Sequence, residues 1–126
     1  MSALDEACAT VVARVEDAFA AAVVLLDTGV VVGANASPPE VEPMVLAAIA
    51  RDMVPPARRA MRIEVAGGGA FDEIYVATPR YSHFAKIVRG GRALLVVAMR
   101  RTSNVGMGWI QVRGCMPIVE PLIPAT

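Results

Sequence analysis

The sequence predicts an α/β (α+β) domain in which a five-stranded sheet carries helices on both of its faces. Three observations lead to this fold. The hydrophobic patterns follow the order helix, two strands, helix, three strands, helix. Several strand-like runs have no polar alternation, which is typical of strands covered on both faces. At 126 residues the chain has the length of one domain with one core, so we expect residues 1–126 to fold as a single unit.

The composition is apolar for a small domain, with 56% hydrophobic and 19% charged residues. Such a balance leaves spare apolar surface, which oligomerisation would hide. Twelve basic residues balance twelve acidic ones, so no net charge attracts nucleic acid or an anionic membrane. No apolar run reaches the roughly 18 residues of a membrane span. Asp5 and Glu6 stand where a signal peptide would be basic, so we expect a cytoplasmic protein.

The first predicted helix starts at a capping-box pattern formed by Ser2 and Asp5. Apolar residues at helical spacing extend this helix to about five turns. Cys8 and Cys115 both lie in apolar helical patterns, where buried reduced thiols are expected, and they have no metal-ligand spacing with His83. The residues on the apolar face of the first helix are Leu4, Cys8, Val11, Val12, Val15 and Phe19.

A tight antiparallel hairpin is predicted next. Residues 23–26 and 30–32 are β-branched runs, and Asp27, Thr28 and Gly29 join them in a short turn where glycine can adopt a positive φ. Neither run alternates with polar residues. We therefore expect the first strand to lie inside the sheet, with both of its faces covered.

The second predicted helix covers residues 37–53, and its central residues 43–50 include no polar side chain. A helix that is apolar all round must be covered on more than one side. We therefore expect it to pack on its own sheet and also on a second protein surface. Pro55 and Pro56 should break or kink it. Residues 57–66 would then form a second helical piece, although residues 62–65 also suit a strand.

Residues 72–78, 82–88 and 93–99 predict three strands joined by short turns, as in a meander. The last run, ALLVVAM, has no polar residue, which favours the centre of the sheet. Asn104 is expected to cap a final helix, and the proline-containing tail to lie extended on the surface. The apolar face of that final helix is formed by Val105, Trp109, Val112 and Met116. Trp109 is expected in the core, with a partner anchor as the alternative.

Four segments fill this order in a particular way. VVLLDTGVVVGANAS leads into the long second helix, and EIYVATP, FAKIVRGGRALLVVAMR and NVGMGWIQVRGCMPIVEPL follow it. Together they resemble the Roadblock family of dynein light-chain and bacterial MglB-type proteins. The resemblance covers nearly the whole chain, and its motifs are packing patterns that include the asparagine, apolar residue and glycine opening the last helix.

The resemblance implies a homodimer, or a dimer with another Roadblock chain, in which the long helices lie side by side and the edge strands join two sheets. It also implies a non-catalytic scaffold that needs no cofactor and binds a Ras-like small GTPase in signalling, cell polarity or motility. In some bacterial members such binding stimulates GTP hydrolysis. By position, residues 72–78 are the edge strand and residues 44–53 the paired helix. The implied dimer interface is Met44, Val45, Ala48, Ile49, Met53, Ile74 and Val76.

The region around the proline pair is the expected partner-binding surface, with Arg51, Asp52, Arg58 and Arg59 as its residues. Arginines are dense here, because Arg62 follows on the same segment. An arginine that reaches a GTPase site would stabilise the charge that develops on phosphate. The plain alternative is a solvated helix face. Nucleic acid is not an expected partner, because no aromatic residues are interleaved for stacking on bases.

Two other functions are compatible with parts of the sequence. A small ligand-sensing α/β domain would need a pocket between sheet and helix, which no polar constellation indicates. The Asp27, Thr28, Gly29 turn is also found in small dimeric aspartic proteases, where two facing carboxylates share one proton. The later apolar strand ending in glycine of those proteases is absent here, and the long helices do not suit their all-β fold. His83, the only histidine, is expected to be a structural residue of its strand.

Overall fold

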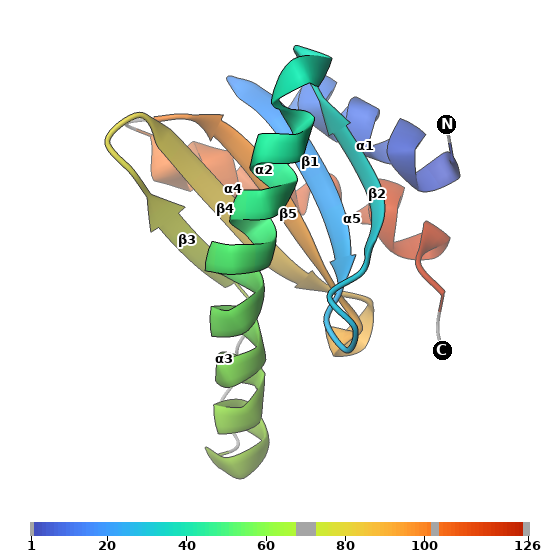
Figure 1. The fold of residues 1–126 in the computed structure, drawn as a ribbon, viewed down its shortest axis with the longest axis vertical. Coiled ribbons are helices and arrows are strands. Elements are labelled where there is room, and N and C mark those ends of the chain that lie inside the picture. The colour runs from blue at the N-terminus through green and yellow to red at the C-terminus, as the bar shows by residue number, and fades with distance from the viewer. Residues whose placement is uncertain (1, 68–72, 102–103, 125–126) are drawn as a thin grey trace.

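A computed structural model describes residues 2–67, 73–101 and 104–124. Its centre is a five-stranded antiparallel sheet with the order β2-β1-β5-β4-β3. The helices form one layer on each face (Figure 1). The strands are β1 (Ala18–Leu25), β2 (Val31–Ala36), β3 (Glu73–Ala77), β4 (Tyr81–Val88) and β5 (Ala93–Arg100). The helices behind the sheet in this view are α1 (Ala3–Arg14), α4 (Val105–Arg113) and α5 (Met116–Val119), and those in front are α2 (Glu42–Ala48) and α3 (Val54–Gly67).

The predicted fold class is thus confirmed, and β5 is the central strand as expected. Every side chain from Ala93 to Met99 is at most 1% exposed. Alternate residues of this strand enter two separate cores. Leu95 and Val97 pack with the α1 and α4 layer, whereas Leu94 and Val96 pack with the α2 layer. A strand without polar alternation fits only a position between two apolar layers.

The first helix is shorter than the five turns predicted. Its start is as expected, because the Ser2 hydroxyl accepts a hydrogen bond from the Asp5 N–H at 3.1 Å and the Asp5 carboxylate accepts one from the Ser2 N–H at 3.0 Å. The helix ends at Arg14, and Asp17, with φ of 64°, turns the chain into β1. Phe19 therefore belongs to a strand. The alanine-rich start of β1 has high helix propensity, but pairing with β5 and burial override that weak local preference.

The predicted hairpin is confirmed, with strands longer than the β-branched runs. The Leu25 N–H donates to the Val30 carbonyl at 2.9 Å, and the Gly29 N–H donates to the Leu25 carbonyl at 2.8 Å. Gly29 has φ of +74°, a conformation that glycine adopts without a steric penalty. The β1–β2 turn is therefore built by local hydrogen bonds.

Pro55 and Pro56 do not break the second helix, which runs from Glu42 to Gly67. A π-helical turn at Ile49–Met53 separates α2 from α3, and the Val54 N–H bonds to the Ile49 carbonyl across it. A proline ring clashes with the carbonyl four residues earlier in a regular α-helix. The wider π turn relieves that clash, so the chain departs from α-helical geometry without leaving the helix. The strand alternative at residues 62–65 is wrong, because these residues are helical.

The C-terminal region begins as predicted and then differs. The Asn104 side chain accepts a hydrogen bond from the Met107 N–H at 2.9 Å, which caps α4. The tail is not extended on the surface. It forms α5 and a 3-10 turn at Glu120–Leu122, and it buries Val119 and Ile123 in the core. Pro117 and Pro121 each occupy the first turn of a short helix, where the missing N–H needs no partner.

At Gly108, α4 packs directly against the sheet. A Cβ atom there would lie 2.6 Å from Cζ of Phe84, whereas at Gly106 the nearest atom would be Asn104 Oδ1 at 3.9 Å. We expect Gly108→Ala to lower the free energy of unfolding by about 2 kcal/mol through overpacking. Gly106→Ala should be neutral or slightly stabilising. Urea unfolding of both variants measures the difference, and equal stabilities would contradict the close approach of α4 to β4.

Candidate protein interface

The face of the sheet that carries α2 is incompletely covered. In Figure 1, α2 crosses the middle of the sheet, and β3 lies beside it at the edge. Ile74 and Val76 point toward this face and are only half-buried. The backbone of β3 pairs with β4 on one side, which leaves its other side as an edge. An edge strand with apolar side chains is a surface suited to pairing with another chain.

Two adjoining pockets lie between α2 and the strands β3 and β4, and we call them together the α2 groove. The larger has a volume of about 170 Å³ and the smaller about 40 Å³. Ala48 and His83 line both pockets, which makes them one continuous depression. Met44, 70% exposed, stands at its rim. The remaining lining residues are Phe19, Val41, Val45, Asp52, Met53, Val76, Thr78 and Tyr81.

The residues expected at a dimer interface divide into two groups. Val45, Ile49 and Met53 are buried against the chain's own sheet, and Ile49 is only 1% exposed. The other group remains at least partly accessible along the α2 groove and β3. It consists of Met44, Ala48, Ile74 and Val76. Pairing of this helix with a second chain remains a prediction, and the accessible group is the one that such a chain would contact.

His83 lies in β4 and faces the α2 groove, so it is half-buried in the wall of a depression. Its Nδ1 atom is buried and has no hydrogen-bond partner among the described residues. Burial lowers the pKa of His83 below its ordinary value, and the Asp52 carboxylate opposes this shift. A neutral imidazole with one unpaired nitrogen therefore lines the groove. The hydrophobic pattern of the strand could not predict that His83 lines a groove, because the groove forms only where α2 packs on the sheet.

The four residues expected to bind a partner are not gathered in one cluster. Arg51 and Asp52 are exposed and joined by two hydrogen bonds, each of 3.0 Å, which hold the pKa of Asp52 below its usual value. Arg59 is also exposed. Arg58 instead lies against the β1–β2 turn, where its Nε–H donates to the Leu26 carbonyl at 2.8 Å. Arg58 therefore contacts a turn of its own chain, whereas the other three residues are exposed.

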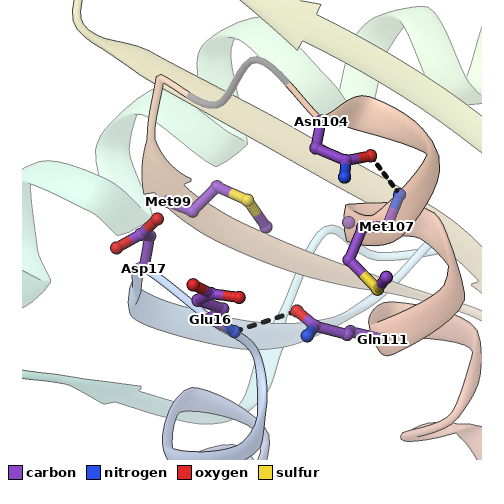
Figure 2. Close-up of a pocket in the computed structure, with 7 residues that line it drawn as sticks. Glu16, Asp17, Met99, Asn104, Met107 and Gln111 are labelled. Carbon is purple, nitrogen blue, oxygen red and sulfur yellow. Dashed lines mark hydrogen bonds between the residues drawn. The ribbon is translucent and has the colours of Figure 1, made fainter.

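A polar pocket of about 260 Å³ lies on the opposite side of the sheet, between the α1–β1 turn and α4 (Figure 2). The Glu16 N–H donates to Oε1 of Gln111 at 3.0 Å across it. Sequence reasoning did not identify this pocket, because its lining comes from three separate segments. Among residues 2–67, 73–101 and 104–124, no three His, Cys, Asp or Glu side chains are grouped to hold a metal. The lining residues are Glu16, Asp17, Met99, Asn104, Met107, Gly108 and Gln111.

Asp27, the residue that an aspartic protease would use, lies in the β1–β2 turn with its side chain 81% exposed. Its carboxylate is 3.8 Å from Nη1 of Arg92. Catalytic carboxylates of such proteases share a proton in an enclosed site, which an exposed, paired carboxylate does not provide. The turn therefore fits the predicted β1–β2 hairpin.

The two cysteines are buried, as predicted, and no disulfide joins them. Burial raises the pKa of Cys8 to about 12, and it also raises the pKa of Cys115. Neither thiol is therefore a reactive thiolate. Trp109 is half-buried, with its ring edge-on to Phe84 at a centroid distance of 4.7 Å and with the Arg113 guanidinium 5.5 Å from its centroid. It packs at the margin of the core.

Solved structures of Roadblock proteins match the chain over nearly its whole length. MglB of Myxococcus xanthus matches with a TM-score of 0.76 at 13% identity. The match covers 97% of this chain and 95% of the MglB chain. A Roadblock/LC7 domain from Streptomyces avermitilis has a TM-score of 0.73 at 19% identity, over 95% of this chain and 97% of that domain. The gliding protein MglB of Thermus thermophilus has a TM-score of 0.73 at 19% identity, over 96% of this chain and 91% of the MglB chain. The chain therefore has the Roadblock fold that its segments predicted.

No protein-family model and no curated protein sequence matches the chain. The structural matches, at these identities, show the fold. Within the described ranges, no helix is long and apolar enough to cross a membrane.

The single histidine provides a direct test of the α2 groove. Because the native pKa of His83 lies below its ordinary value of 6.5, the unfolded chain binds the proton more readily. The stability from neutral His83 is therefore complete above about pH 6.5 and is lost as the pH falls through that value toward the native pKa. We expect an NMR titration of the imidazole to give a pKa below 6.5.

The carboxylate of Asp52 raises this pKa, so Asp52→Asn should lower it further. Asp27→Asn changes an exposed carboxylate in the β1–β2 turn and serves as the control, with no change expected. A pKa at or above 6.5, or an equal response to both substitutions, would contradict the described position of His83.

Proposed function

We propose that the protein is a non-catalytic, dimeric regulatory platform that binds a Ras-like small GTPase. The observation that carries this proposal is the α2 groove, an apolar depression beside the edge strand of a Roadblock fold. The structural likeness to MglB, one example of which is described as a gliding protein, supports a role in motility or cell polarity. In this proposal residues 1–126 act as one domain in the cytoplasm, without a cofactor.

The dimer would bury the surface that the fold leaves open. Two copies related by a two-fold axis can pair their β3 edges antiparallel and place their α2 helices side by side, because the same patch serves both subunits. Ile74, Val76 and Ala48 would then lose their remaining exposure, and Met44 would enter an apolar environment. Another Roadblock chain with the same open face could replace the second copy.

The GTPase contact is proposed at the exposed polar residues that follow α2. Arg51 and Asp52 neutralise each other, so they can offer a hydrogen-bonding pair without a net charge. Arg59 adds an exposed guanidinium about two turns further along the helix. Such a cation suits the acidic and phosphate-bearing surface of a nucleotide-loaded GTPase. The proposed function is recruitment of the GTPase. Measurement of phosphate release shows whether binding also changes the rate of GTP hydrolysis.

The dimer is tested at Met44, which is exposed, rather than at Ile49, which is buried in the protomer. We expect Met44→Asp to give a folded monomer, because a charge in an apolar interface has no partner. Met107→Asp is the matched control, since Met107 is exposed on α4 at the other face of the sheet. Circular dichroism reports folding, and light scattering after size exclusion reports mass. A Met44→Asp variant that remains dimeric would contradict the proposed interface.

The GTPase contact is tested with purified Ras-like GTPases encoded near the gene, loaded with GDP or with a non-hydrolysable GTP analogue. We expect capture to depend on the nucleotide and to weaken about fivefold in Arg59→Gln, as for loss of one charged interface contact. Arg14→Gln changes an exposed arginine at the end of α1 and should have no effect. Phosphate release in the same mixtures measures hydrolysis. Negligible capture in both nucleotide states would favour the ligand-sensing alternative.

A further inference from the structure

Another pocket lies at the end of the sheet where two turns meet α3, and we call it the α3 pocket. Its volume is about 270 Å³. The β1–β2 turn and the turn before β5 lie at the same end of the sheet (Figure 1), joined by the Leu26 N–H, which donates to the Arg92 carbonyl at 3.0 Å. The lining residues are Leu26, Asp27, Arg58, Arg62 and Gly91. None of them lines the α2 groove.

The lining of the α3 pocket is positively charged, although the whole chain is neutral. Arg58 and Arg62 are four residues apart, so both guanidinium groups arise from one face of α3. Of the described lining residues, only Asp27 is acidic, and its carboxylate lies 3.8 Å from Nη1 of a third arginine, Arg92. The two guanidinium groups of the lining, those of Arg58 and Arg62, therefore have no ion-pair partner among the described residues.

Arg58 is held in place by the turn. Its Nε–H donates to the Leu26 carbonyl at 2.8 Å, which leaves the N–H groups of both terminal nitrogens as further donors. Gly29 makes room for this arrangement, because a Cβ atom there would lie 3.1 Å from Nη2 of Arg58. A guanidinium fixed at one nitrogen loses little freedom when it binds an anion. The side chain is thus oriented before any ligand arrives.

We propose that the α3 pocket binds a dianionic phosphate group, as free phosphate or as a phosphate monoester, through Arg58 and Arg62. Guanidinium groups bind phosphate oxygens through paired hydrogen bonds, and charge-assisted bonds of this kind are the strong ones. Two cations on one helix face repel each other, and one dianion neutralises both, whereas a single carboxylate matches only one. Gly91 presents no side chain that would fill the pocket. Arg51, Asp52 and Arg59 of the proposed GTPase contact do not line this pocket.

The test uses the full chain, labelled with 15N, and titrations with inorganic phosphate, phosphoserine and glutamate. We expect saturable shifts of the Gly91 amide with the two phosphates, and weaker binding of glutamate. Arg62→Gln should weaken phosphoserine binding about tenfold, as for loss of a charged hydrogen-bonding partner. Arg14→Gln is the control, because Arg14 is an exposed arginine at the end of α1 and does not line the pocket. Its dissociation constant should stay within about twofold of the unchanged protein.

The outcomes separate the possible sources of the phosphate. Tighter binding of phosphoserine than of inorganic phosphate assigns the site to a monoester on a larger molecule, and the reverse assigns it to free phosphate. Absence of saturable shifts at Gly91, equal weakening by both substitutions, or equal affinity for glutamate would overturn the proposal. The Arg62→Gln variant should keep the mass of the unchanged protein in solution, because Arg62 is not part of the proposed dimer interface. Weaker phosphate binding at an unchanged mass is therefore distinct from loss of the dimer.

Discussion

The burial of β5 on both of its faces is the constraint on which the rest of the structure depends. Seven consecutive side chains, Ala93–Met99, are enclosed, so the sheet needs an apolar layer in front and another behind. The layer of α1, α4 and α5 covers one face with short helices that pack closely, to the point that Gly108 touches the ring of Phe84. Apolar burial of this extent is the dominant stabilising contribution to such a fold.

Among the described helices, only α2 and its continuation form the other layer, and the functional proposal follows from that shortage. One helix cannot cover five strands, because strands are about 4.8 Å apart and a helix is about 10 Å wide. The edge near β3 therefore stays open, with Val76 half-buried and the imidazole of His83 unpaired at Nδ1 among the described residues. The open face supports the proposed dimer, while the arginines of α3 form a separate charged site at the end of the sheet.

Local signals predicted most of the fold. The capping residues Ser2 and Asn104, the β1–β2 turn and the meander were predicted correctly, because each depends on residues close together in the sequence. Predictions failed where distant contacts oppose local preference. The alanines at the start of β1 favour a helix but pair with β5, and the tail after Pro117 folds into helical turns because Val119 and Ile123 can be buried there.

The sequence by itself determined the order of the elements, the central position of β5 and the presence of a helix apolar on every side. Hydrophobic period and turn chemistry are sufficient for these features, since both act over a few residues. Only the tertiary structure decided that Ile49 belongs to the protomer's core and Met44 to its surface. The sides of α2 differ in burial only once the helix packs on the sheet. The same holds for Arg58, which meets the β1–β2 turn only once residues 32 positions apart are brought together.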